Sequence, residues 1–160
     1  MDRGKMGDNP MLNLELVKVG LEAADREAAI CFLATLLERG GYVKKSFQAA
    51  VLERESTFPT GLPTGEINVA IPHADSVHVL QSAIAVGVLA EPVKFHQMGE
   101  PETSLDVDLV MVLAIQDPKA VVPFLQKACT MFQDQKLLAD LKASTQSQEV
   151  VELLRIRLEN

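Results

Sequence analysis

Apolar residues in this chain fall into helical stripes and short extended runs, separated by glycine and proline. Between residues 11 and 19 apolar and polar positions nearly alternate, which predicts an extended entry segment or a short strand. Asp25 can cap a helix over residues 26–39, whose apolar positions recur at helical spacing before a glycine pair ends it. A second helix is predicted over residues 45–55 by the same periodicity.

The middle of the chain has the character of strands rather than helices. Residues 58–65 contain two prolines and two glycines, which predicts a stiff loop that continues neither a helix nor a central strand. Three apolar runs after this loop predict strands, over residues 68–71, 82–89 and 107–115. A fourth run, residues 93–95, is expected to be a short edge piece. Residues 107–115 are apolar at nearly every position, so both faces of this strand should be covered, as in the centre of a layered sheet.

The last third of the chain returns to helical spacing. One helix is predicted to begin after Asp117-Pro118, with Pro123 tolerated in its first turns. A further helical turn or two is expected over 134–141, and Ser147 can cap a final helix over 148–158. Helices surrounding a few apolar strands, without a repeat or an interdomain linker, predict a single α/β domain with helices on both faces of the sheet.

Composition narrows the classes of function. The chain has 160 residues, is 48% apolar and carries a net charge of −7, which suits one globular domain and argues against a nucleic-acid or anionic-membrane surface. Residues 1–10 are expected to form a flexible tail, and no apolar run has membrane-spanning length, so we expect a cytoplasmic protein without membrane insertion. Cys31 and Cys129 lie in apolar helical contexts and are expected to be buried free thiols.

His73 is the candidate centre of chemistry. It follows a short apolar strand and Pro72, so it stands at a strand end on a stiff stem, where ligands of α/β sheets usually bind. A neutral imidazole nitrogen near pH 7 is a nucleophile that can carry a phosphoryl group, provided that the other ring nitrogen donates to an acceptor. A backbone carbonyl or a carboxylate would serve as that acceptor. A partly buried histidine in a turn is the alternative interpretation.

A phosphoryl group on His73 would also need positive charge and hydrogen-bond donors nearby. Arg54 ends a predicted helix nineteen residues earlier, and a guanidinium can grip phosphate with two hydrogen bonds. Thr60 and the backbone at Gly61 are the best placed further donors in the loop. The residues around Arg54 also fit a solvated helix end, in which the arginine pairs with a neighbouring glutamate.

Metal chemistry has little support in the sequence. A zinc site from His73, Asp75 and His78 fits no strong ligand spacing, and there is no Cys/His pattern for zinc. His78 and His96 are better explained as surface or core residues. We therefore expect neither a metal nor a cofactor.

The run from Arg54 to Gly61, followed by Ile71-Pro72-His73, resembles the IIA components of the bacterial phosphoenolpyruvate-dependent sugar phosphotransferase system. Within that group the chain is similar to the fructose/mannitol superfamily and most like its galactitol-type members. The segments that carry the galactitol likeness are 58–61, 71–75 and 93–98. The resemblance implies an EIIA type-2 domain over residues 11–160, with a mixed β-sheet sandwiched by α-helices.

The resemblance also implies a function and partners. His73 would take a phosphoryl group from the phosphocarrier protein HPr and give it to a cysteine of a cognate IIB component, which phosphorylates sugar during transport through a membrane IIC component. Arg54 would steady the phosphoryl group. An alternative is a regulatory module, as in the nitrogen-related branch, whose phosphorylation state controls binding to another protein. A degenerate, non-catalytic relative is a third alternative, which intact His73 and Arg54 argue against.

The chain departs from many relatives at one position. They carry a second histidine at the start of the helix after the central strand, and here Val121 stands in its place. The galactitol-type proteins also lack that histidine, so its absence does not imply inactivity. It implies that Arg54 and backbone donors carry more of the stabilisation of the phosphoryl group.

Overall fold

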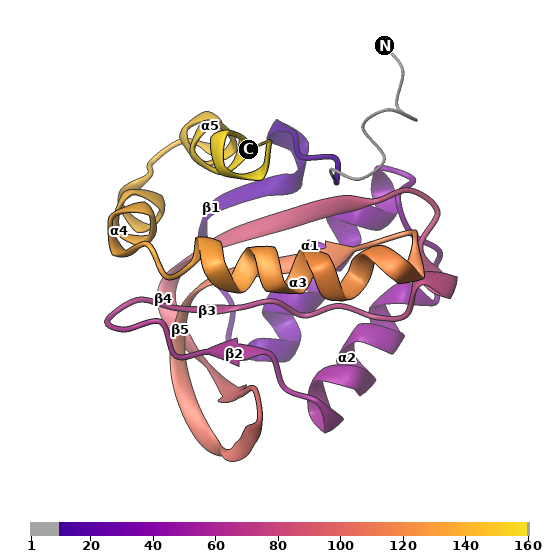
Figure 1. The fold of residues 1–160 in the computed structure, drawn as a ribbon, viewed down its shortest axis with the longest axis horizontal. Coiled ribbons are helices and arrows are strands. Elements are labelled where there is room, and N and C mark those ends of the chain that lie inside the picture. Colours follow the sequence, from indigo (N-terminus) through magenta and orange to yellow (C-terminus); the bar gives the residue numbers. More distant parts are fainter. Residues whose placement is uncertain (1–9, 160) are drawn as a thin grey trace.

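The computed structural model describes residues 10–159, which form a mixed five-stranded sheet with helices on both faces (Figure 1). The predicted tail, residues 1–10, lies outside the described residues except for Pro10, which is buried. In chain order the elements are the short 3-10 turn η1 (Leu14–Leu16), β1 (Val17–Leu21), α1 (Arg26–Arg39), α2 (Phe47–Thr57), β2 (Gly61–Leu62), β3 (Asn68–Ala70), the 3-10 turn η2 (Ser76–His78), β4 (Ala83–Gln97), β5 (Glu100–Ala114), α3 (Pro118–Met131), α4 (Gln135–Ala143) and α5 (Ser147–Leu158).

A long antiparallel hairpin of β4 and β5 forms the middle of the sheet. β1 runs parallel to the first half of β4, and β3 runs parallel to β5 on the opposite edge of the hairpin. The expectation that residues 93–95 form an edge piece is wrong. They belong to β4, where Val93 pairs with Val107 and Phe95 pairs with Leu105 of β5. A break in register after Val88 interrupts the apolar run, which explains why one strand looks like two in the sequence.

The predicted loop over residues 58–65 contains a two-residue strand, so that prediction is wrong in part. In β2, Gly61 pairs antiparallel with Ala70 of β3 and parallel with Gln97 at the far end of β4. Two residues are too few to leave a periodic pattern, and the flanking prolines lie outside the paired positions. The segment between α2 and β3 is therefore fastened to the sheet at its middle.

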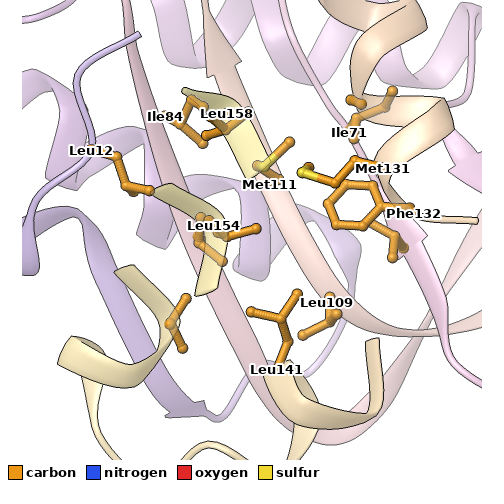
Figure 2. Close-up of a cluster of buried hydrophobic side chains, with 14 of the residues drawn as sticks. Leu12, Ile71, Ile84, Leu109, Met111, Met131, Phe132, Leu141, Leu154 and Leu158 are labelled. Atoms are coloured by element: carbon orange, nitrogen blue, oxygen red, sulfur yellow. The ribbon is translucent and has the colours of Figure 1, made fainter. Parts of the chain in front are cut away.

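The apolar core lies in two layers on either side of β5, which confirms the predicted central strand. Leu109, Met111 and Leu113 of β5 pack in the layer under α3, α4 and α5. Val110 and Val112 alternate with them and pack in the layer under α1 and α2. Figure 2 shows part of the first layer, in which Leu109 and Met111 lie close to side chains of the C-terminal helices. The fold class predicted from the sequence, an α/β domain with a mixed sheet between helices, is confirmed.

The helix boundaries follow the capping signals closely. The Asp25 carboxylate accepts from the backbone N–H of Ala28 at 2.8 Å, as predicted for the start of α1. The predicted cap of the last helix is off by one residue, because Gln146 precedes α5 and Glu149 accepts from its N–H at 3.0 Å. The Ser147 hydroxyl instead donates to the Val17 carbonyl at 3.2 Å, which ties α5 to β1.

Candidate functional site

His73 lies directly beyond β3 and is held against the central strand. It forms a parallel bridge with Leu113 of β5, whose N–H donates to the Pro72 carbonyl at 2.9 Å. The side chain is only 7% exposed. Its Nδ1 lies 2.9 Å from the Ile71 carbonyl oxygen, and because a carbonyl can only accept, Nδ1 carries the hydrogen. Nε2 then keeps its lone pair, and it has no hydrogen-bond partner among the described residues.

The electrostatics of the site favour the neutral imidazole. Burial lowers the pKa of His73 below its ordinary value of 6.5, and the positive charge of Arg54 lowers it further. The hydrogen bond to Ile71 and the negative charge of Asp75 act in the opposite direction, but the net shift is downward. At neutral pH the ring is therefore uncharged, with Nδ1 as its donor and a lone pair on Nε2.

Arg54 occupies the last turn of α2, half-buried and without an ion-pair partner in the part of the chain that the structure describes. Its Nε is buried and has no hydrogen-bond partner there either. The guanidinium carbon lies 5.4 Å from the centre of the Phe58 ring, within the range of a cation–π contact. The interpretation of Arg54 as a surface residue paired with an adjacent glutamate does not fit these contacts, which leave the cation free for an anion.

A cleft of about 570 Å³ joins the Arg54 side of the site to the segment after His73. One wall comes from α2 and Phe58, and the other from Ala74, Asp75 and His78. His73 does not line this cleft itself, although the two residues that follow it do. The Ser76 hydroxyl, three residues after His73, is buried and has no partner among residues 10–159. The neighbourhood of His73 thus holds three unsatisfied polar atoms, which is typical of a site that completes its hydrogen bonds with a ligand.

The hydrogen bonds that Thr60 and Gly61 make within residues 10–159 run to α2 and to the sheet segments, and none of them joins Arg54 or the His73 side chain. Thr60 is 2% exposed, and it uses both of its donors on Glu55: its N–H at 2.9 Å and its hydroxyl at 2.8 Å. The Gly61 carbonyl accepts from the Met98 N–H at 2.8 Å, and a Cβ at Gly61 would lie 2.6 Å from the His96 carbonyl oxygen. The phosphate-binding role of these two residues stays a prediction. Their contacts fasten the loop to α2 and the sheet.

Glu55 is the site residue that the sequence interpretation missed. It is 4% exposed, and burial raises its pKa to about 7, although the hydrogen bonds from Thr60 and the charges of Arg26 and Arg54 favour the ionised form. The sequence does carry a signal for it. Phe47, Val51 and Glu55 recur at intervals of four, which places all three on the buried face of α2.

The chain belongs to the family of EIIA components described as "Phosphoenolpyruvate-dependent sugar phosphotransferase system, EIIA 2", whose model matches residues 10–156. The resemblance noted in the sequence is thereby confirmed. Among curated proteins, the galactitol-specific EIIA component of Escherichia coli K12 is 28% identical over 144 residues, which cover 90% of this chain and 86% of that protein. The mannitol-specific EIICBA component of the same organism is 31% identical over 146 residues, 89% of this chain but 22% of that protein.

Solved structures agree with this assignment. Enzyme IIAMTL of Escherichia coli, in its complex with phosphorylated enzyme IIBMTL, superposes with a TM-score of 0.76 at 26% identity, covering 91% of this chain and 97% of that chain. The nitrogen regulatory protein IIA-Ntr of Neisseria meningitidis has the same fold, with a TM-score of 0.72 at 22% identity over 94% of this chain and 99% of that one. Within residues 10–159, no helix is both long enough and apolar enough to cross a membrane.

The charges around His73 predict two opposite changes in its titration. Arg54→Gln removes a cation and should raise the pKa of His73, whereas Asp75→Asn removes an anion and should lower it. Imidazole signals followed by NMR through a pH titration measure both shifts, and the wild-type pKa should lie below 6.5. Shifts of the same sign in the two variants would contradict the arrangement described above.

Burial of Glu55 predicts a pH dependence of stability. The folded protein keeps a proton on Glu55 that the unfolded chain releases, so this group's contribution to stability declines as pH rises from 4.5 to about 7. Glu55→Gln has no titrating group at this position. The free energy of unfolding of wild type minus that of the variant should therefore fall across this window and level off above it. Urea unfolding at several pH values tests this, and a difference that grows with pH would contradict it.

Proposed function

We propose that this protein is a phosphoryl carrier of the sugar phosphotransferase system, with His73 as the residue that bears the phosphoryl group. The observation that carries the proposal is the state of the imidazole: it is neutral, with Nδ1–H bonded to the Ile71 carbonyl and Nε2 without a partner. The Nε2 lone pair forms the bond to phosphorus while the bond between phosphorus and the donor breaks. In the second step the nitrogen–phosphorus bond breaks as a thiolate of the acceptor attacks.

Arg54 supplies the charge that this transfer needs. Its guanidinium is free of carboxylates in the described part of the chain, and its charge is already felt at His73, where it lowers the pKa. As the phosphoryl group approaches, its negatively charged oxygens form an ion pair with the Arg54 guanidinium. Thr60 and Gly61, in the loop after α2, are proposed as further phosphate-binding residues. Val121 provides no such help, because it packs half-buried against the apolar core instead of offering an imidazole.

The family and the surface around the site support HPr as the donor and a IIB component as the acceptor, with the membrane IIC component reached only through IIB. One solved relative is a IIA protein in complex with its phosphorylated IIB partner. Phe58, Val77 and Leu80 are large exposed apolar residues that flank the cleft and the histidine segment, as expected of a surface that protein partners cover. The galactitol-specific relative makes galactitol the first sugar to test.

A regulatory role is the alternative, in which phosphorylation of His73 controls binding to another protein. The observation that favours it is the likeness to IIA-Ntr, although at 22% identity that likeness extends to the fold alone. The relatives with sugar-specific descriptions match at higher identity over most of this chain, which supports the transport role.

Phosphorylation of His73 is testable with purified components. Incubation with phosphoenolpyruvate, enzyme I and HPr should add about 80 Da to the protein, one phosphoryl group that is acid-labile and base-stable, as expected of a phosphoramidate. His73→Ala should abolish the adduct, whereas His78→Ala, which changes the cleft wall, should retain it. Mass spectrometry measures both. Wild-type protein that takes no phosphoryl group from any HPr would overturn the proposal.

Loss of the guanidinium should slow transfer without unfolding the protein. Arg54→Ala removes the charge that balances the phosphoryl oxygens, and the expected slowing is about 10- to 1000-fold, as for other lost charge-stabilising donors. Arg54→Lys should recover only part of the rate, because lysine cannot form the paired hydrogen bonds. Arg39→Ala, at the exposed end of α1, is the matched control. A rate in Arg54→Ala equal to that of Arg39→Ala would remove Arg54 from the site.

A further inference from the structure

A continuous path of hydrogen bonds joins α2 to the imidazole of His73. The Glu55 carboxylate accepts from the Thr60 hydroxyl at 2.8 Å and from the Thr60 N–H at 2.9 Å. The Thr60 hydroxyl oxygen in turn accepts from the Ile71 N–H at 3.2 Å. On the other side of the same residue, the Ile71 carbonyl accepts from His73 Nδ1 at 2.9 Å. Glu55, Thr60 and His73 are all buried, so water does not compete strongly for these bonds.

Ile71 lies directly beyond the end of β3, where its backbone is held by contacts with Thr60. β3 ends at Ala70, and among residues 10–159 the Ile71 N–H bonds only to Thr60, through the hydroxyl oxygen and through the carbonyl at 3.3 Å. Pro72 follows, so the next residue has no N–H to anchor the chain. The orientation of the Ile71 carbonyl therefore rests on the Thr60 contacts, on the buried isoleucine side chain and on the bridge of His73 to Leu113.

A carboxylate at position 55 fixes which groups donate and which accept in this series of hydrogen bonds. Above the pKa of Glu55, about 7, the ionised carboxylate can only accept. The Thr60 hydroxyl must then donate to it, which leaves the hydroxyl lone pairs to accept from the Ile71 N–H. An amide in the same place can donate to the hydroxyl oxygen and compete with Ile71. The N–H and the carbonyl of Ile71 belong to two different peptide groups, so the hydrogen bonds are not coupled through one amide. Thr60 therefore acts by fixing the position of the Ile71 carbonyl.

We propose that Glu55 and Thr60 are positioning residues for phosphoryl transfer, which hold the Ile71 carbonyl where it keeps His73 in the tautomer with Nε2 free. If the carbonyl moves away, the hydrogen can shift to Nε2, and the ring then presents no lone pair to phosphorus. The effect on transfer rests on the function proposed above. The effect on the tautomer does not, since it exists in the protein alone.

Four variants separate this positioning role from plain structural support. Thr60→Val keeps the shape of the side chain but removes the hydroxyl, and Thr60→Ser restores it. Glu55→Gln keeps the shape at position 55 while losing the fixed donor and acceptor roles. Thr64→Val is the matched control, because the Thr64 hydroxyl lies in the same loop and donates to the Ile67 carbonyl at 2.6 Å, away from Ile71.

Two measurements decide the outcome. The imidazole ¹⁵N signals of His73 at about pH 8 report which nitrogen carries the hydrogen. The rate of phosphoryl uptake from HPr reports function. Thr60→Val and Glu55→Gln should move His73 toward the Nε2–H tautomer and slow uptake by about 10- to 100-fold, the range seen when partners that fix a histidine tautomer are lost elsewhere. Thr60→Ser should keep the wild-type tautomer, and Thr64→Val should match wild type in both measurements.

Unchanged ¹⁵N signals in folded Thr60→Val and Glu55→Gln would overturn the proposal, whatever happens to their stability. The proposal would also be overturned if Thr64→Val shifts the ¹⁵N signals as much as Thr60→Val and Glu55→Gln do. Should Thr60→Val fail to fold, the decision rests on Glu55→Gln, which keeps the volume at position 55. A wild-type protein that takes no phosphoryl group would refute the proposed function, yet the tautomer signals would still test the positioning role.

Discussion

The pairing of β4 with β5 is the constraint on which the rest of this fold depends. This hairpin offers two outer edges: β1 and β2 attach to β4, and β3 attaches to β5. Alternate residues of β5 face the two helical layers, so this one strand contributes side chains to both halves of the core. The bridge between His73 and Leu113 extends the β3 edge by one more contact. His73 is thus fastened to the buried half of β5, which limits the freedom of its backbone.

The site concentrates groups that are unfavourable for folding. α2 and the segment after β3 carry a neutral imidazole, a guanidinium and a buried carboxylate. Among residues 10–159 the imidazole Nε2 has no hydrogen-bond partner and the guanidinium has no ion pair. Burial of each group opposes folding, because the group gives up hydrogen bonds to water and does not regain a full set of partners inside the protein. The apolar layers offset this loss and hold the groups in place. Such placement is expected of a site that completes its interactions only when a phosphoryl group arrives.

Much of this arrangement can be predicted from the sequence, and the parts that cannot have clear physical reasons. The central strand is predictable because nearly every position from 107 to 115 is apolar. His73 is predictable as a candidate because Pro72 ends a strand directly before it. The strand β2 is not, since its pairing with β4 is a contact between residues 36 positions apart with no local pattern. The acceptor that orients His73 is a backbone carbonyl, which no side-chain pattern can reveal. Glu55 lies among charged residues, and the polar composition of that helix end outweighs its four-residue spacing from Val51.

The valine at position 121 shows how the histidine can work without a second imidazole. A second ring would supply one more donor to the phosphoryl oxygens, but that donor would itself need a partner to fix its tautomer. Here the available donors are the guanidinium of Arg54, which has no tautomer to fix, and polar groups such as the Ser76 hydroxyl, which can rotate toward a ligand. The single tautomer that has to be controlled is that of His73, and the Ile71 carbonyl controls it. The chemistry therefore depends on one orienting bond, and on the contacts of Thr60 that keep its acceptor in place.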